Sequence, residues 1–396
     1  MIVLFHPSLV ARGGSQKYCI DYYNHFKKKH NVLLITYNYS ENCYPEIIRE
    51  KDIIYAQKYS KKKSNIKPYF IKIFLSFIYE IILTKKLIKI LIERKIKFSD
   101  IKIFFQHETQ FNFLCGSLGC YKNYLFLYDS KNKLYFFDKG KDLNFIDNLS
   151  IKILYYLSNK FLLKKYNKIF VLEETQKKEI DNRYNLNSSI VYGYFNEKKF
   201  FKLKNNILKD KFNLDKKTTI IFSLTRFSRY KNIEDIFEFY KKTLLNKNDV
   251  FIYIKAMKDD FDYQNEIFFK YSKYIYPHGN IYIDDTTSKN EDELFELYNS
   301  SDIFIFSSRN QTWGNAILES IACGQIPIIS DECGINTLIK KHNLGKVYSV
   351  KNINELYSSF LSIISNFDSY NMNHNFVKKE LTFNNHIKKI TNYINV

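Results

Sequence analysis

The sequence predicts an α/β protein built from two doubly wound, Rossmann-like domains. Its 396 residues are too many for one ordinary hydrophobic core. Apolar residues make up 45% of the chain, so each half can form a sizeable core of its own. Strand-like and helix-like segments alternate, and the alternation restarts after a polar stretch. This pattern is typical of parallel sheets that are covered on both faces.

In the first half, short apolar runs predict the strands of one sheet. A strand at residues 2–5 is followed by a glycine pair and a helical stretch near residues 15–29. The stretch 58–98 is long, basic and apolar. The remaining strands are expected at residues 32–37, 102–106, 124–128 and 168–172, with a helix from Glu174 after the last of them. We assign residues 1–200 to this first domain.

The second half repeats the same alternation after a Lys-rich, weakly periodic stretch, residues 197–217, which we interpret as a linker. Strands are expected at 218–224, 249–255, 280–284, 302–306 and 326–330, and helices at 232–246, 261–275, 291–299, 315–323, 335–341, 353–366 and 383–395. The second domain is expected to span residues 201–380. Two such domains facing each other place the carboxyl ends of both sheets around one crevice, where open α/β sheets bind ligands.

The formal net charge of +20 indicates an anionic partner. Nucleic acid, an acidic membrane surface and a phosphate-bearing substrate all meet that description, and charge alone does not choose among them. The six cysteines lack metal-ligand spacing and are expected to be reduced and buried. The N-terminus does not resemble a signal peptide and no run reaches about 20 apolar residues, so we expect a cytoplasmic protein.

The most informative segment is SSRNQTWGNAILESIACGQIPIIS, residues 307–330, which predicts a strand end, a loop, a helix and the next strand. Gly314 lets a ligand approach the backbone, and Asn315 is suited to cap the helix that ends near Cys323. The free amides at a helix N-terminus bind a diphosphate well. Glu319, four residues into the helix, has the chemistry to accept hydrogen bonds from two ribose hydroxyls.

This segment resembles the family-four glycosyltransferases, whose fold is called GT-B. The family pattern is a Glu, seven residues that include a glycine, a second Glu, a run of small residues and a Gly. Glu319 stands at the second Glu, whereas Gln311 replaces the first. The resemblance continues at Cys333–Gly334, where the family usually has paired glycines.

Three further matches follow in the family's order. Arg226 and Lys231, in SLTRFSRYKNIEDIF, match the cations that hold the donor diphosphate. Gly13–Gly14, in ARGGSQ, match the glycine turn after the first strand, and His107, in IFFQHETQF, matches a histidine that faces the transferred sugar. Each of these alone is compatible with an ordinary turn, a chance pair of cations or a structural histidine. Their order along the chain is what indicates the family.

The resemblance implies a retaining enzyme that moves a sugar from a nucleoside-diphosphate-sugar to a hydroxyl, without a metal or another cofactor. His107 and Gln311 would act at the sugar, while Gly13, Gly14, Arg226, Lys231, Gly314, Asn315 and Glu319 would bind the donor. A donor phosphate oxygen would deprotonate the acceptor. The final stretch, residues 381–396, is similar to the family's helix that crosses back to the first domain.

Gln311 is the main departure from the family, because an amide forms hydrogen bonds but carries no charge. The donor sugar is then contacted differently, or turnover is slow, or activity has been lost; the other phosphate-binding elements favour an active enzyme. Asn196 is a second departure, at a position where the family often has Val–Asp before the linker. The alternatives are a non-catalytic scaffold and a basic nucleic-acid-associated protein, although no helix-turn-helix, RNP or zinc signature indicates nucleic acid.

The stretch 61–97 mixes apolar residues with many lysines. Such segments bind anionic membrane surfaces, and this interpretation predicts a lipid-linked or surface-glycan acceptor at the inner face of the membrane. The alternative is a pair of helices packed on the first domain with their lysines in solvent.

Overall fold

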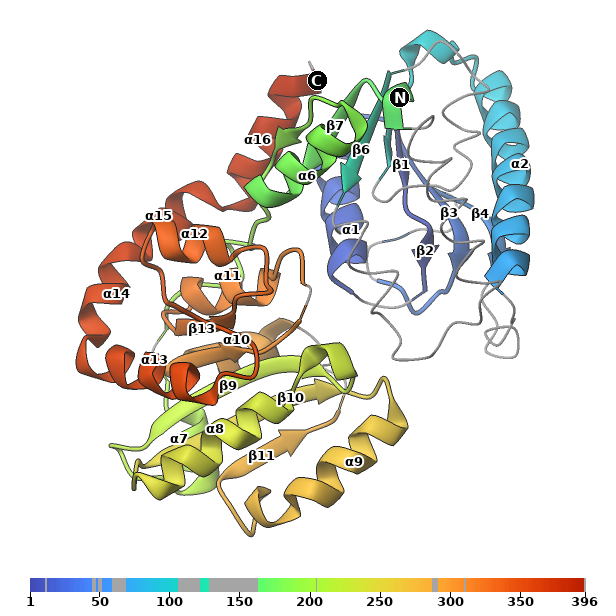
Figure 1. The fold of residues 1–396 in the computed structure, drawn as a ribbon. Coiled ribbons are helices and arrows are strands. Elements are labelled where there is room, and N and C mark those ends of the chain that lie inside the picture. The colour runs from blue at the N-terminus through green and yellow to red at the C-terminus, as the bar shows by residue number, and fades with distance from the viewer. Residues whose placement is uncertain are drawn as a thin grey trace. The chain divides into compact units, whose positions relative to one another are not determined.

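The computed structural model describes residues 1–10, 13–44, 48, 52–58, 69–105, 122–127, 163–203, 205–286, 291–309 and 311–394. The described residues up to Ile190 form one compact unit, and those from Val191 onward form a second. Each unit is built around a parallel sheet of its own (Figure 1). The predicted α/β fold with two parallel-sheet domains is confirmed. The domain limits at residues 200 and 380, and the return of residues 381–396 to the first domain, stay predictions.

The sheet of the first unit has the order β2-β3-β1-β5-β6-β7-β8, with β4 paired to β3. Its strands are β1 (Ile2–Phe5), β2 (Ser8–Leu9), β3 (Val32–Tyr39), β4 (Ile53–Lys58), β5 (Lys102–Phe105), β6 (Lys122–Leu127), β7 (Lys168–Val171) and β8 (Ser189–Ile190). The five strands predicted from apolar runs are therefore present. β1 is buried along its whole length between β3 and β5, as expected of a central parallel strand.

The helices of the first unit are α1 (Gly14–Phe26), α2 (Tyr69–Glu93) and α6 (Glu174–Tyr184). α2 lies alongside β3 and β4 (Figure 1). Leu83, Leu87 and Leu91 recur every four residues, so they share one face of α2, and all three are buried in the core. The described part of the basic stretch 61–97 is thus mainly one long helix.

The sheet of the second unit has the order β11-β10-β9-β12-β13-β14. Its strands are β9 (Thr219–Arg226), β10 (Val250–Met257), β11 (Ile281–Asp284), β12 (Ile303–Phe306), β13 (Ile326–Ser330) and β14 (Lys346–Tyr348). Its helices are α7 (Ile207–Phe212), α8 (Glu234–Leu245), α9 (Phe261–Tyr271), α10 (Glu291–Asn299), α11 (Asn315–Ala322), α12 (Asn336–Lys341), α13 (Ile353–Ser365), α14 (Phe367–Asn373), α15 (Asn375–Glu380) and α16 (Phe383–Ile394). The predicted linker was partly wrong, because α7 lies within it and buries Leu208.

The C-terminal helix α16 packs on the segment that opens the second unit. Phe195 pairs with Thr382 in a parallel bridge, and the backbone N–H of Phe383 donates to the carbonyl of Phe195 at 3.2 Å. The Nδ1–H of His386 donates to the carbonyl of Tyr192 at 2.7 Å. α16 is therefore fixed by main-chain bonds as well as by the side chain of His386.

Candidate functional site

The strand order of the second sheet places a crevice between two neighbouring strands. From β9 the chain moves to β10 and β11 on one side, and then returns to β12 on the other side of β9. In doubly wound sheets, ligands bind at the carboxyl ends of the strands where the order reverses in this way. β9 ends at Arg226 and β12 at Phe306, so the two predicted donor-binding segments begin at this point.

Lys231 and Gln311 meet at this switch point. The Nζ of Lys231 donates to the Oε1 of Gln311 at 2.9 Å, although 80 positions separate the two residues in the chain. Only 8% of Lys231 is exposed, and its ammonium lies 5.4 Å from the ring centre of Phe306. The Oγ of Ser307 donates to the carbonyl of Lys231 at 2.9 Å. The ammonium is thus held in one place before any anion binds.

Arg226 is the more exposed of the two predicted cations. Its guanidinium lies 3.8 Å from the carboxylate of Asp259, and 43% of its side chain is exposed. Asp259 also accepts a hydrogen bond from Ser228. A long contact to a half-exposed carboxylate stabilises the pair little, so Arg226 can turn toward a stronger anion at small cost.

The main chain of Gln311 is fixed by the loop that follows β13. The backbone N–H of Gly334 donates to the carbonyl of Gln311 at 2.7 Å, and Gln311 forms an isolated parallel bridge with Cys333. The thiol of Cys333 contacts the carbonyl of Trp313 at 3.7 Å. The loops after β12 and β13 are therefore connected through their backbones.

The helix after this loop begins one residue earlier than its predicted cap requires. Gly314 is the N-cap, and α11 runs from Asn315. The predicted capping role of Asn315 is therefore wrong. A Cβ on Gly314 would lie 2.7 Å from Cδ1 of the buried Ile317, so glycine avoids a collision there. The N–H groups at the start of a helix point along its axis, so this end of α11 is suited to an anion.

Glu319 lies on α11 with only 7% of its surface exposed. Its Oε2 accepts a hydrogen bond of 3.1 Å from the hydroxyl of Tyr298, on α10. Tyr298 is fully buried; burial, and then the charge of Glu319, raise the pKa of its hydroxyl well above the ordinary value. Tyr298 therefore stays a neutral donor. The sequence reasoning missed this residue, because it stands in an ordinary helical pattern without a motif.

The comparisons with known proteins cover this part of the chain directly. Residues 204–380 match the family model described as glycosyl transferases group 1. We call residues 204–380 the group 1 domain, after the family model that they match. A search of curated protein sequences gave no match.

Several solved structures are similar to this chain over its whole length, beyond the group 1 domain. Sucrose-phosphate synthase from Thermosynechococcus elongatus is 11% identical with a TM-score of 0.74, over 100% of this chain and 98% of that one. Anabaena HepE in complex with UDP and glucose is 12% identical with a TM-score of 0.73, over 100% and 99%. WaaG, a glycosyltransferase involved in lipopolysaccharide biosynthesis, is 12% identical with a TM-score of 0.68, over 99% of each chain. The fold is thus that of the GT-B glycosyltransferases.

The predicted glycine pair, Gly13–Gly14, lies at the start of α1 in the first unit. Gly13 is the N-cap, with extended backbone angles that any residue can adopt, and a Cβ on Gly14 would meet nothing within 4 Å. The space around position 14 therefore does not require a glycine. Beside it, the Nε2 of His6 lies 3.2 Å from Ser15 Oγ, at the carboxyl end of β1. The predicted His107 lies outside the described residues.

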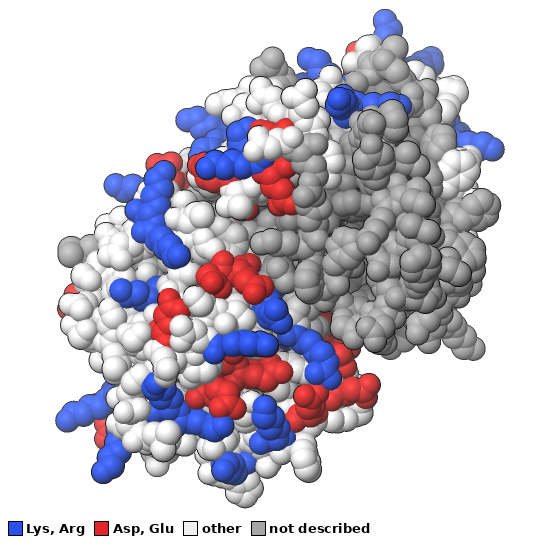
Figure 2. Space-filling model, in the orientation of Figure 1, with Lys and Arg blue, Asp and Glu red and all other residues white. Residues whose placement is uncertain are grey.

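The surface of the group 1 domain is mixed in charge. On the face shown in Figure 2, Lys and Arg alternate with Asp and Glu over the lower unit. Ion pairs of this domain include Arg229 with Glu266 and Lys258 with Asp285. The described residues of the second unit on that face therefore form no continuous basic stripe of the kind that follows a nucleic-acid backbone. No helix in the described ranges is both long and apolar enough to cross a membrane.

Proposed function

We propose that the protein is a retaining, metal-independent glycosyltransferase of family four that transfers a hexose from a nucleoside-diphosphate-sugar to a hydroxyl. One observation supports this most: the buried Lys231 ammonium is held against Gln311, close in the chain to the N-terminus of α11, at the switch point of the group 1 domain. The complexes of HepE with UDP favour uracil as the donor base.

In this proposal, the donor diphosphate is held by positive groups that converge from two loops. Arg226 and Lys231 follow β9, and the amides of Gly314 and Asn315 follow β12. Charge-assisted hydrogen bonds to a diphosphate strengthen as it departs, because its negative charge grows when the glycosidic bond breaks. Glu319 binds the ribose hydroxyls, and Gln311 contacts the sugar through its amide.

The acceptor hydroxyl attacks from the side of the leaving diphosphate, and a phosphate oxygen takes its proton. His107, Gly13 and Gly14 complete the sugar site in this proposal, and residues 381–396 return to the first domain. Because this route uses a donor oxygen as the base, the protein needs to supply none.

We further propose a cytoplasmic protein that contacts the inner membrane face through α2, with a lipid-linked or surface-glycan acceptor. Lys85, Ile88, Lys89 and Ile92 recur at helical spacing, so they share one face of α2. The two lysines are exposed, and 69% of Ile92 is exposed. Cations beside an exposed apolar side chain suit an anionic membrane surface.

The test is a transfer assay with UDP-, GDP- and ADP-sugars against a panel of glycan and lipid-linked acceptors. The wild-type protein should transfer sugar from one donor with retention, and Lys231→Met should lower kcat/KM by at least tenfold, which is about 1.4 kcal/mol. Lys247→Met, at an exposed turn after α8, is the matched control and should behave as wild type. A wild-type rate no faster than buffer would favour the scaffold alternative.

A further inference from the structure

Helix α10 connects Glu319, in the proposed nucleotide site, to a buried charge network. Near its C-terminal end, Tyr298 donates to Glu319 at 3.1 Å, and the tyrosine is fully buried. Near its N-terminal end, Glu293 accepts a hydrogen bond from Lys255 on β10. α10 is therefore attached at both ends, to the sheet and to α11.

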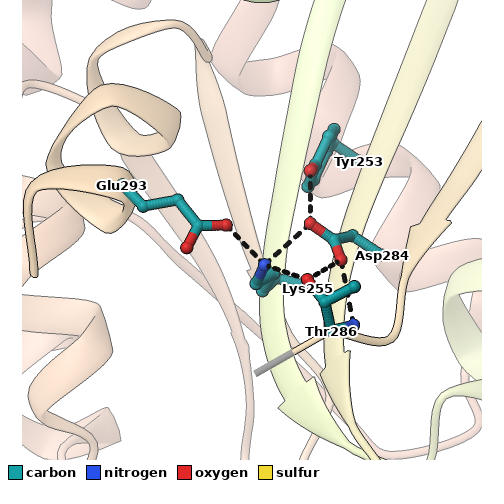
Figure 3. A network of polar contacts seen from close by, with 5 residues as sticks. All are labelled: Tyr253, Lys255, Asp284, Thr286 and Glu293. Atoms are coloured by element: carbon teal, nitrogen blue, oxygen red, sulfur yellow. Dashed lines mark hydrogen bonds and ion pairs between the residues drawn. The ribbon is translucent and has the colours of Figure 1, made fainter. Parts of the chain in front are cut away.

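The network at the N-terminal end is centred on Lys255, as Figure 3 shows. The side chain of Lys255 is fully buried, and its Nζ lies 2.7 Å from the carboxylate of Asp284, the last residue of β11. Asp284 also accepts hydrogen bonds from Tyr253, at 2.8 Å, and from Thr286. Burial by itself would raise the pKa of Asp284, but the hydrogen bonds from Lys255, Thr286 and Tyr253 lower it to about 2.

This arrangement fixes the position of α10. A buried ammonium that loses a carboxylate partner is strongly destabilised, so Lys255 holds Glu293, and with it the first turn of α10, against the ends of β10 and β11. The last turn of α10 then presents the Tyr298 hydroxyl to Glu319. A carboxylate accepts about four hydrogen bonds, and the bond from Tyr298 occupies one of these positions.

We propose that Tyr298 is a positioning residue that orients Glu319 so that its carboxylate binds the vicinal hydroxyls of the donor ribose. The ligand class is a ribonucleotide whose 2′- and 3′-hydroxyls are both free. The proposal deepens the proposed function and rests on it. Tyr298 acts through Glu319, so its contribution should disappear when the nucleotide lacks these hydroxyls.

The experiment compares UDP with 2′,3′-dideoxy-UDP on the full chain by calorimetry. Wild type should bind UDP at least tenfold more tightly, the effect expected for hydrogen bonds to a charged group. Tyr298→Phe, which removes only the hydroxyl, should bind both nucleotides as weakly as wild type binds dideoxy-UDP. The expected result is thus a ratio near one in the variant.

The matched control is Tyr271→Phe. Tyr271 is also buried and also donates to a carboxylate, that of Glu238 at 2.9 Å, but it ends α9 and packs on Phe237 of α8. This variant loses a tyrosine–carboxylate bond in the same domain, yet its ratio of affinities should equal that of wild type. Melting temperatures of both variants report the purely structural cost.

Three results would overturn the proposal. A Tyr298→Phe protein that keeps the wild-type ratio shows that the hydroxyl does not act on the ribose. A wild type that binds both nucleotides equally shows that Glu319 does not bind these hydroxyls. Because that protein still binds UDP, this result contradicts the inference but not the proposed function. A wild type that binds neither UDP nor any other nucleoside diphosphate removes the proposed function, and this inference with it.

A second variant covers the case in which Tyr298→Phe does not fold. Glu293 has a side chain that is 33% exposed, and Glu293→Gln weakens the attachment of α10 at its other end. The ratio of UDP to dideoxy-UDP affinity should fall at least twofold in this variant. An unchanged ratio would contradict the role of α10.

Discussion

At the scale of single residues, the side chain at position 311 determines the charge beside the Lys231 ammonium. The amide oxygen of Gln311 accepts from Lys231, which leaves its NH₂ group as a donor for another partner. A glutamate in its place would form an ion pair with the same ammonium. The exchange therefore changes both the hydrogen-bonding pattern and the net charge of this loop.

Gln311→Ala should lower the turnover number about tenfold or more, while the affinity for UDP stays within about twofold of wild type. The reason is that the proposed contacts to the nucleotide come from Arg226, Lys231 and Glu319. Gln311→Glu should raise the rate or change the order of preference among donor sugars, because a carboxylate stabilises positive charge at the anomeric carbon. Initial transfer rates and UDP titrations of the three proteins check this.

A parallel fall of turnover and UDP affinity in Gln311→Ala would place this side chain on the diphosphate instead. Ser358→Ala, on the exposed surface of α13, controls for loss of a polar side chain in the same domain. It should change neither quantity.

The sequence could predict which residues follow β9 and β12, because glycines, cations and apolar runs mark these positions locally. It could not predict that Lys231 and Gln311 bond to each other, since that contact depends on β9 and β12 lying side by side in the sheet. Tyr298 was missed for the same reason. Its partner Glu319 is on another helix, and nothing in the spacing reveals the pair.

At the scale of elements, the docking of α16 depends on a neutral histidine. Burial lowers the pKa of His386 to about 3, against the opposing effect of its hydrogen bond to Tyr192, and nearby Lys389 adds to the lowering. The tilted ring of Tyr194 lies 4.6 Å away. A charged imidazole at this position would break favourable packing between α16 and residues 192–196.

The sign of the pH effect follows from this lowered pKa. An unfolded histidine titrates near pH 6.5, so between about pH 6.5 and 3 the unfolded chain binds a proton that the folded chain does not. The stability from neutral His386 is full above pH 6.5 and falls by up to about 1.4 kcal/mol per pH unit below it. Urea unfolding at pH 7, 6 and 5 should show this slope.

His386→Gln should be less stable than wild type at pH 7 but should lose less stability on acidification, because glutamine does not titrate. Exposed His278 provides the matched control, and His278→Gln should keep the wild-type slope. Equal slopes in His386→Gln and wild type would show that another group controls the acid response. His374, whose pKa burial lowers to about 4, is the first such group to replace.

Element ends were predicted less well than element cores. The five strands of the second sheet that the sequence predicts are nearly continuous apolar runs, so they could be recognised without any partner. α7 was missed because three of its six residues are charged and only Leu208 is buried. The cap of α11 was misplaced by one residue, since both Gly314 and Asn315 have cap-forming character.

At the scale of the whole molecule, the excess of 61 Lys and Arg over 41 Asp and Glu indicates an anionic partner. Part of this charge lies on α2, beside the exposed Ile92. The face of the second unit in Figure 2 carries both signs instead. The effect of the charge on α2 can therefore be tested separately from the effect of the net charge of the protein.

Replacing Lys85 and Lys89 together with Glu should weaken sedimentation with phosphatidylserine vesicles, by about 1 kcal/mol for each lysine removed from the surface. Binding of wild type should also weaken as salt rises, because salt screens the attraction. The control is Lys216→Glu with Lys217→Glu, which makes the same charge change at exposed positions of the second unit. Equal loss in both double variants would assign the binding to net charge, and equal binding to neutral vesicles would exclude an electrostatic mechanism.

The bond between Gly334 and Gln311 has a consequence for how donor preference can diverge among related proteins. Position 311 is held by its own carbonyl and by pairing with Cys333, and both are main-chain interactions that any amino acid can make. We therefore expect substitutions at this position to leave the backbone of the two loops in place, while they change the hydrogen-bond partner of Lys231. Selection for a new sugar can then begin with a single codon change that alters one side chain in an unchanged loop.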